Sequence, residues 1–467
     1  MVVGEMAEPA DLLVVGAGPG GYVAAARAAQ LGREVTLVER GGSEGGIGGS
    51  CLHVGCIPSK ALIELADAFH RSTSSSQPGL TVSGANFDLV AFQGWKAEVV
   101  GTLAKGVEGL LDGRRVRRLA GELRFAGPAR AVVASAGEPA RFIDFRQVIV
   151  ATGSRPVFPP GLQPDGRRVL SSTDVLALSE LPGSVAVVGA GYIGLELGTA
   201  LAKLGVRVTV IEALDRILPG FDSDLTRPVQ RRLEALGVEL RLGSRVRAFE
   251  GEEVLLDEQE GEGRIEAERL LVAVGRRPNT DELGLEALGI SLEPGGTIAV
   301  DDSMRASDTV AAIGDVTAGP ALAHRASAQA IVAAEALCGL PAVFDPLSVP
   351  EVVFTDPELA AVGMTATQAR AAGLEVDELK LPASANGRAA TLAATDGLTK
   401  VVLERSNGRV AGVQIAGPHA SELAAGAGLA VEMMATAEDV LATIHPHPTL
   451  SEGMHSALEP ARRTPVG

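Results

Sequence analysis

The sequence predicts an α/β protein with two Rossmann-like dinucleotide-binding domains and a C-terminal α+β domain. Three observations support this fold class: a repeated glycine-rich motif, a length of 467 residues, and a change in sequence character near residue 346. Ordinary domains have roughly 100–200 residues, so a chain of this length needs more than one core. We expect two to four domains.

The repeat is the strongest of these observations. Residues 14–40 read VVGAGPGGYVAAARAAQLGREVTLVER, and residues 187–213 read VVGAGYIGLELGTALAKLGVRVTVIEA. Each copy has an apolar strand, the motif G-x-G-x-x-G, an Ala/Leu-rich helix and a β-branched strand that ends in glutamate. In both copies the glutamate lies 23 positions after the first glycine, Glu39 after Gly16 and Glu212 after Gly189. This context is typical of a dinucleotide-binding turn.

The motif has a physical explanation. The first two glycines let the backbone turn and approach a pyrophosphate, and the third lets the helix pack on the strand. The helix N-terminus attracts phosphates, while the final glutamate can bind a ribose diol. A glycine-rich turn without a ligand is the alternative, and two matching copies weaken it. Two sites imply two dinucleotides, and a flavin beside a nicotinamide would allow hydride transfer. Glu212 would repel a 2′-phosphate, which favours NAD over NADP.

Other segments indicate how the chain is divided. ATGSRP (151–156) and AVGRRPN (273–279) each follow an apolar strand and indicate crossings between the two dinucleotide folds. Beyond residue 346, EVVFTDPELAAVG, KVVLE and VAGVQIAG indicate antiparallel strands, with a helix near 421–435. We expect the first part of an FAD-binding domain at 1–150, an NAD-binding domain at 151–275, a second FAD or central part at 276–345, and an interface domain at 346–467.

Composition excludes several classes of function. The net charge of −17 disfavours nucleic acid as a partner, because phosphate binding needs excess Lys and Arg. The first ten residues contain Glu5 and Glu8 but no Lys or Arg, so they lack a secretory pattern. The apolar run near 12–15 is too short to span a membrane. We therefore expect a cytoplasmic protein without a membrane or nucleic-acid partner.

Two of the three cysteines lie close together in GGSCLHVGCIPSKAL (48–62). Cys56 begins an expected helix, whose dipole favours the thiolate, and Lys60 adds positive charge. We expect no metal site, because C-x4-C is an awkward ligand spacing and no second cysteine pair follows. Inert buried cysteines are the alternative, which we assign to Cys338. For Cys51 and Cys56 a redox pair beside a flavin fits better.

The segment HPHPTLSE (445–452) supplies a candidate base for thiol chemistry. Prolines flank His447 and allow a cis bond at His447–Pro448. Glu452 could hold the imidazole in one tautomer. Taken alone, this segment is more often the start of a capped helix. The dithiol and flavin context makes His447 and Glu452 a candidate catalytic pair.

These motifs resemble the flavin-dependent pyridine nucleotide–disulfide oxidoreductases, and among them the dihydrolipoamide dehydrogenases, over nearly the whole chain. The resemblance also includes AIGDV with GPALAH (312–324) and ANGRA (385–389). It implies a homodimer with FAD and NAD, in which Cys51 and Cys56 of one subunit meet His447 and Glu452 of the other. Cys51 would exchange with the substrate and Cys56 would face the flavin. It also implies that Lys60 pairs with Glu196.

The motifs and the resemblance together give two sets of cofactor-binding residues. Those expected at FAD are Gly16, Gly18, Pro19, Gly20, Gly21, Glu39, Gly49, Ser50, Lys60, Gly121, Thr152, Gly153, Asp315 and Ala323. Those expected at NAD are Gly189, Gly191, Tyr192, Ile193, Gly194, Glu212, Val246 and Gly275. Tyr192 would cover the nicotinamide pocket, and Asp315 would bind the ribityl chain.

The implied reaction is oxidation of dihydrolipoamide, either free or on a lipoyl carrier of another chain, with an acyltransferase core as a further partner. One alternative is an NAD(P)H-dependent reductase of another low-molecular-weight or pathway-specific disulfide. Another is a docking or scaffold subunit, which the intact cysteines and His447 disfavour. His53, Leu123 and the glycine-rich stretch 41–49 depart from the family pattern. These departures are compatible with an enzyme that acts on a pathway-specific substrate.

Overall fold

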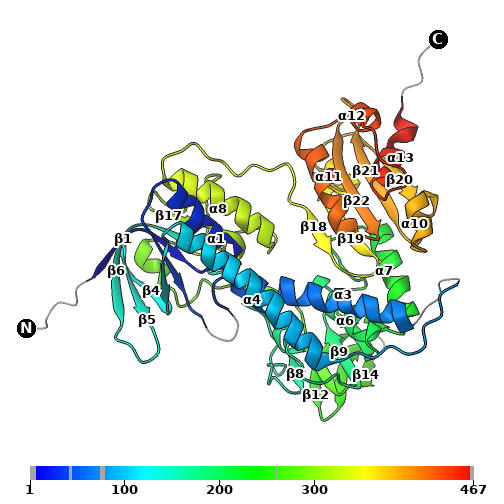
Figure 1. Ribbon diagram of the computed structural model, residues 1–467, viewed down its shortest axis with the longest axis horizontal. Coiled ribbons are helices and arrows are strands. Elements are labelled where there is room, and N and C mark those ends of the chain that lie inside the picture. Colours follow the sequence, from blue (N-terminus) through cyan, green and yellow to red (C-terminus); the bar gives the residue numbers. More distant parts are fainter. Residues whose placement is uncertain (1–6, 42–44, 74–78, 259–260, 463–467) are drawn as a thin grey trace, which may run out of the picture.

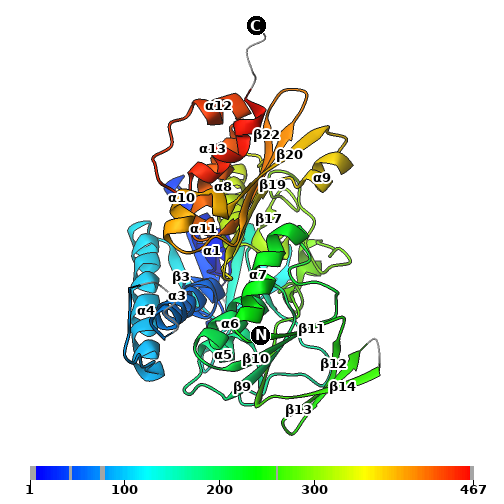
Figure 2. The ribbon, with the colours of Figure 1, turned by 90° about the vertical axis from the view of Figure 1, so that its right-hand side faces the viewer.

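The computed structural model describes residues 7–41, 45–73, 79–258 and 261–462 (Figures 1 and 2). Residues 42–44 of the glycine-rich stretch and Glu5 of the N-terminal segment lie outside the described part. The predicted α/β class is confirmed: the first region has a mixed, largely parallel sheet, the second a parallel sheet, and the C-terminal region an antiparallel sheet. None of the helices in the described ranges has both the length and the apolar character needed to cross a bilayer.

A seven-stranded sheet forms the first region, in the order β3-β2-β1-β6-β5-β4, with β17 paired to β6. Its strands are β1 (Glu8–Val15), β2 (Val35–Glu39), β3 (Arg117–Ala120), β4 (Glu122–Gly127), β5 (Arg130–Ala134), β6 (Arg141–Val150) and β17 (Val310–Ala312). Helices α1 (Pro19–Gln30) and α8 (Ala323–Leu337) lie side by side against it (Figure 1). Both bury alanines in one apolar cluster, and such small side chains permit close helix packing.

Three helices connect β2 to β3. They are α2 (Gly49–His53), α3 (Cys56–Thr73) and the long α4 (Leu89–Gly113). Helix α3 begins at Cys56, as predicted, with Pro58 in its first turn. It extends away from the first sheet and packs against α6 of the second region.

The second region has a parallel sheet in the order β11-β10-β9-β15-β8. The strands are β8 (Val169–Leu170), β9 (Ser184–Val188), β10 (Arg207–Glu212), β11 (Glu239–Leu242) and β15 (Arg269–Val272). Its helices are α5 (Ser172–Leu176), α6 (Tyr192–Lys203) and α7 (Ser223–Ala235). An antiparallel sheet of β12 (Arg245–Glu250), β13 (Glu253–Glu258) and β14 (Gly261–Glu266) adjoins it. Strands β7 (Ser154–Pro156) and β16 (Arg276–Pro278) pair where the two predicted crossings meet.

The third region is an antiparallel sheet, as predicted, and its strand order is β18-β19-β22-β21-β20. Its strands are β18 (Glu351–Val353), β19 (Glu358–Gly363), β20 (Val376–Pro382), β21 (Leu398–Glu404) and β22 (Val410–Gly417). Its helices are α9 (Ala366–Ala371), α10 (Gly387–Thr391), α11 (Ala420–Glu432), α12 (Ala437–Ala442) and α13 (Glu452–Leu458). The sheet and helices α11–α13 share one core.

One predicted strand is shorter than expected. The segment TVAAIGDV (309–316) predicts a single apolar strand that ends at Gly314–Asp315, but β17 ends at Ala312 and a 3-10 turn, Gly314–Val316, follows. Gly314 has a φ of +71°, which turns the chain away from the sheet. The turn places Asp315 at the cavity described below.

Candidate active site

The first and third glycines of each motif are required by close backbone contacts. A Cβ on Gly16 or Gly189 would lie 2.3 or 2.4 Å from a carbonyl oxygen at the end of the adjacent strand. A Cβ on Gly21 or Gly194 would lie 1.7 or 2.1 Å from the carbonyl oxygen of its own first glycine. No side chain fits at such distances, so both copies need glycine for the same packing reason.

The middle glycines face open space instead. A Cβ on Gly18 or Gly191 would meet no protein atom within 4 Å. Each residue immediately precedes the first turn of a helix, α1 or α6, where backbone N–H groups point outward. A cradle of this kind fits a pyrophosphate, which a side chain would otherwise displace.

The two motif glutamates make matching hydrogen bonds. Oε2 of Glu39 accepts one from the backbone N–H of Ala17 at 2.5 Å, and Oε2 of Glu212 accepts one from Ala190 at 2.8 Å. Each carboxylate, at the end of one strand, therefore stabilises the glycine turn that follows the neighbouring strand. This arrangement places an acceptor beside each turn, as ribose binding requires.

A cavity of about 1170 Å³ opens along the first glycine turn. This exceeds the roughly 300–1,000 Å³ of drug-sized pockets and suits an extended dinucleotide. All the residues predicted at FAD line it except Gly21, which packs beneath the turn: Gly16, Gly18, Pro19, Gly20, Glu39, Gly49, Ser50, Lys60, Gly121, Thr152, Gly153, Asp315 and Ala323. The donor set and shape therefore fit FAD.

Only part of the predicted NAD set reaches this cavity. Tyr192 and Ile193, at the start of α6, line it. The others lie outside the cavity, in the second glycine turn, at the end of β10, in β12 and just after β15: Gly189, Gly191, Gly194, Glu212, Val246 and Gly275. Tyr192 is 41% exposed as a residue, but the protein around its hydroxyl partly desolvates it and raises its pKa; Arg276 opposes the shift, and the carboxylates of Glu196 and Asp315 add to it. Tyr192 thus stands between the cavity and the second turn.

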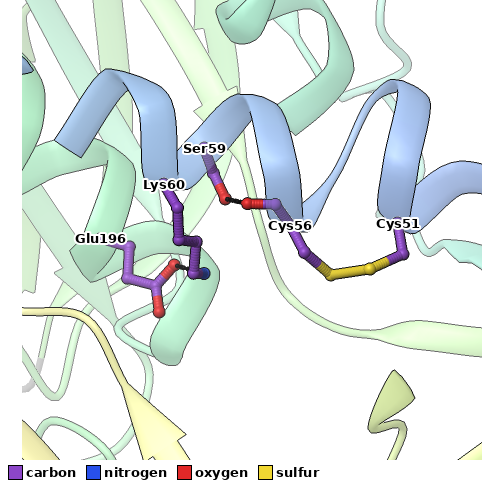
Figure 3. The surroundings of a disulfide bond; sticks show 5 residues. All are labelled: Cys51, Cys56, Ser59, Lys60 and Glu196. Carbon is purple, nitrogen blue, oxygen red and sulfur yellow. Dashed lines mark hydrogen bonds and ion pairs between the residues drawn. A yellow bond between two sulfur atoms is a disulfide. The ribbon is translucent and has the colours of Figure 1, made fainter. Parts of the chain in front are cut away.

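Cys51 and Cys56 form a disulfide at the cavity wall (Figure 3). Cys51 lies in α2, and Cys56 is the first residue of α3. Helix α2 lies directly against the first glycine turn, because a Cβ on Gly49 would be 2.5 Å from the Cα of Gly18. Within the described residues, no three His, Cys, Asp or Glu side chains converge as a metal site. The geometry suits thiol–disulfide exchange beside the cavity.

Lys60 and Glu196 form an ion pair one turn into α3, as the resemblance implies (Figure 3). The Lys60 ammonium lies 2.8 Å from Oε2 of Glu196, whose side chain is 4% exposed. Phe354, which the sequence analysis missed, contacts both partners. Its backbone N–H donates to Oε1 of Glu196 at 2.9 Å, and its ring centroid lies 4.4 Å from the Lys60 nitrogen. The cation is therefore fixed near the disulfide.

Asp315 also lies among hydrogen-bonded residues of the cavity, of which Ser154, Arg276 and Asn279 were not predicted from the sequence. The hydroxyl of Ser154 donates to Asp315 Oδ2 at 2.5 Å and accepts from Nε of Arg276 at 2.8 Å. Asn279 exchanges hydrogen bonds with Thr152. These residues belong to ATGSRP and AVGRRPN, so the two predicted crossings were the signal that could have found them.

His447 and Glu452 are also paired. Nδ1 of His447 lies 2.9 Å from Oε1 of Glu452, and the His447–Pro448 bond is cis. The Thr449 N–H, and then the imidazole, lower the pKa of Glu452 below its ordinary range. The His447 side chain is 78% exposed, and neither residue lines the cavity. One subunit therefore does not bring this pair to its own disulfide.

The structure also shows the environment of His53, Leu123 and the third cysteine. Nε2 of His53 lies 3.0 Å from the carbonyl oxygen of Ile47, so this histidine closes the loop before the disulfide. Leu123 is buried in β4 and lines the cavity. Cys338, expected to be buried, is only partly buried because it caps the end of α8.

Comparison with known proteins identifies the family. The model "Pyridine nucleotide-disulphide oxidoreductase" matches residues 10–330, and the model of its dimerisation domain matches residues 349–458. The chain belongs to the pyridine nucleotide–disulphide oxidoreductases. Proteins with these domains use FAD and NAD, and the dimerisation domain supports a homodimer.

Relatives named dihydrolipoyl dehydrogenase match along the full chain. The protein of Geobacillus stearothermophilus is 46% identical over 100% of this chain and 99% of its own length. That of Bacillus subtilis (strain 168) is 44% identical over 100% of this chain and 99% of its own length. Dihydrolipoyl dehydrogenase 2 of Haloarcula marismortui is 45% identical over 99% of this chain and 98% of its own.

Solved structures share the fold. LpdA from Mycobacterium tuberculosis has a TM-score of 0.87 at 30% identity and covers 97% of this chain and 100% of its own. The Cu(II) complex of the HOCl-induced flavoprotein disulfide reductase RclA from Escherichia coli has a TM-score of 0.85 at 27% identity. It covers 97% of this chain and 99% of its own.

Proposed function

We propose that the protein oxidises dihydrolipoamide to lipoamide and reduces NAD, by way of the Cys51–Cys56 disulfide and FAD. The observation that carries this proposal is the disulfide on the wall of a cavity that also contains the first glycine turn and Tyr192. The name shared by the full-length relatives at 44–46% identity supports the choice of substrate.

Each chemical step can be assigned to residues of this chain. His447 of the partner subunit takes a proton from one substrate thiol, while Glu452 of the partner subunit orients the imidazole. The substrate thiolate attacks Sγ of Cys51, the Cys51–Cys56 bond breaks, and Cys56 leaves as a thiolate. The second substrate thiol then gives up its proton and attacks the first substrate sulfur, which closes the lipoamide ring and breaks the bond to Cys51; Cys51 leaves and takes up that proton as a thiol. The substrate is oxidised, and the disulfide is reduced to the Cys51 thiol and the Cys56 thiolate, with the other proton on the partner subunit's His447.

FAD, when bound, supplies the path for the two electrons from the dithiol to NAD. The residues that line the cavity would hold FAD, and those around the second glycine turn would hold NAD. Lys60 favours the Cys56 thiolate by its positive charge, and Glu196 holds Lys60 in place. Tyr192 would cover the nicotinamide pocket until NAD arrives.

The finer organisation belongs to the same proposal. We place the domain boundaries at 1–150, 151–275, 276–345 and 346–467. The lipoyl group would be carried by another chain, with an acyltransferase core as a further partner, in the cytoplasm. The exposed His447 supports a site completed by a second copy.

A reductase of another disulfide remains the second candidate, because the solved structure of RclA, a flavoprotein disulfide reductase, shares this fold. The deciding experiment measures purified enzyme with dihydrolipoamide plus NAD or NADP, and with glutathione, mycothiol-type and other disulfides plus NADH or NADPH. We expect the highest kcat/KM with dihydrolipoamide and NAD. A clear preference for NADPH and another disulfide would overturn the proposal, and a scaffold subunit would show no turnover in any arm.

A further inference from the structure

Helices α3 and α6 are joined by a second ion pair beyond Lys60–Glu196. Asp67 of α3 pairs with the ammonium of Lys203, the last residue of α6. Lys60 and Asp67 are seven residues apart, and so are Glu196 and Lys203. Seven residues in a helix advance by about 10 Å, or two turns. The two helices therefore run side by side in the same direction, with matched charged positions.

The charges are arranged so that only one register satisfies both pairs. In the first pair α3 supplies the cation, and in the second it supplies the anion. If α3 slid by two turns, Asp67 would face Glu196, and like charges repel. Between the pairs, Ala66 and Ala200 are buried in one apolar cluster. The ion pairs thus specify the alignment that the apolar contact alone leaves undetermined.

The segment after β18 contacts both pairs. The backbone N–H of Phe354 binds Glu196 at 2.9 Å. Two residues further on, Oδ2 of Asp356 lies 2.7 Å from Lys203 and 2.8 Å from Nε of Arg232 in α7. The C-terminal region therefore contacts both ion pairs, and at the second pair Asp356 connects α6 to α7.

Lys203 is the cation shared by Asp67 and Asp356 in the second ion-pair group. Its side chain is 4% exposed, and a buried ammonium needs anionic partners to offset its lost hydration. Burial acts to raise the pKa of Asp356, but Lys203 and Arg232 lower it below its ordinary range. Asp356 is therefore ionised at neutral pH and can neutralise Lys203 together with Asp67.

We propose that Lys203 is a positioning residue: with Asp67 and Asp356 it fixes the register of α3 against α6. It thereby holds the Lys60–Glu196 pair and the disulfide at the cavity wall. Lys203 does not line the cavity, so it acts only through these helices. The relevance of the register to turnover rests on the proposed function, whereas the register is a property of the fold.

The test compares three variants of the flavin-loaded enzyme. Lys203→Met removes the charge at similar size, and Lys203→Arg keeps it. Lys400→Met is the matched control, because Lys400 is as buried as Lys203 and pairs with Asp222 and Asp224 at the start of α7 rather than with α3. Two properties are measured: amide hydrogen exchange in residues 56–67, and the long-wavelength absorption of the two-electron-reduced enzyme.

We expect Lys203→Met to speed exchange in 56–67 by about tenfold or more and to weaken the absorption band, because α3 loses its fixed register. Lys203→Arg should restore both properties, and Lys400→Met should leave both as in the wild type. Equal changes in the two Met variants, or no change in Lys203→Met, would overturn the proposal.

If Lys203→Met fails to fold, Asp67→Asn provides the same measurement with a milder change. Faster exchange in 56–67 would support the proposal, and wild-type exchange would refute it. Wild-type turnover with dihydrolipoamide is measured separately. Its absence would reject the proposed function and leave the exchange result standing.

Discussion

Nδ1 of His447 lies 2.9 Å from Oε1 of Glu452, while the other oxygen of that carboxylate accepts the Thr449 N–H at 2.7 Å. The carboxylate is held by the backbone and in turn holds the ring. No described residue makes a hydrogen bond with Nε2 of this exposed imidazole. The pair is therefore arranged to act on a group outside its own subunit.

Replacing His447 by Ala should lower turnover with dihydrolipoamide by about 10²–10⁴-fold, because a general base contributes that much. FAD content and oxidation of NADH by an artificial dye should change by less than about twofold, since neither needs this base. His445→Ala is the control in the same exposed loop. Near wild-type turnover of His447→Ala, or an equal loss in the control, would remove His447 from the mechanism. Steady-state kinetics with dihydrolipoamide and NAD measures the turnover of each variant.

Two glycine substitutions should separate binding from folding. In Gly191→Ala the new Cβ meets no protein atom within 4 Å, so we expect a normal fold and FAD content. KM for NAD should rise about tenfold or more, because the methyl group occupies the phosphate cradle.

In Gly194→Ala the Cβ would lie 2.1 Å from a carbonyl oxygen, so the turn must shift. We expect a stability loss of about 1–3 kcal/mol or more, measured by thermal unfolding. Equal behaviour of the two variants would contradict this assignment.

Glu212 should determine the preference between nicotinamide cofactors. Glu212 accepts from the N–H groups of Ala190 and Leu214; Glu212→Gln keeps one acceptor oxygen for the Ala190 N–H and removes the charge that repels a 2′-phosphate. We expect kcat/KM with NADP to rise by about tenfold relative to NAD. Glu239→Gln, on the neighbouring strand β11, is the control and should leave the ratio unchanged. A ratio that stays constant in Glu212→Gln would show that another group selects the cofactor.

Asp356 should stabilise the fold in a pH-dependent way. Its pKa is lowered in the folded state, because Lys203 and Arg232 outweigh the effect of burial. Its stabilisation is therefore complete above the unfolded-state pKa of about 3.9 and is lost as pH falls through the lower folded-state value. The gap in urea midpoint between wild type and Asp356→Asn should be constant from pH 7 to 5 and shrink below about pH 4.

The control for this measurement is Asp345→Asn. Asp345 is exposed, and its side chain has no hydrogen-bond partner among the described residues. Its midpoint should follow the wild type at every pH. A gap for Asp356→Asn that widens as the pH falls would contradict the assigned direction.

The sequence predicts the structural features that depend on a local pattern of residues, such as strands, glycine turns and helix starts. The repeat located both parallel strand–turn–helix units, and the glutamates of the two copies do occupy matching places. The helix that begins at Cys56 and the antiparallel C-terminal sheet were predicted for the same reason. Lys60 and Glu196 lie 136 positions apart, and only the family resemblance suggested that they pair.

Contacts without a local pattern were not predictable. Lys203 ends a helix like many other lysines, and nothing near it in sequence points to Asp67 or Asp356. Ser154 stands in a turn where a serine would ordinarily be solvated, but tertiary packing makes it a bridge between Asp315 and Arg276. Such pairs depend on how separate elements meet, which periodicity and spacing do not encode.

The pairing of β17 with β6 has a consequence for how the molecule is made. The first sheet stops at Val150 and is extended only at Val310, after the whole second region has been synthesised. Asp315 and helix α8 follow later still. A nascent chain on the ribosome therefore completes the second region while the first is still missing one strand. FAD can meet its full set of contacts only after about two-thirds of translation, so flavin loading should be a late event in biogenesis.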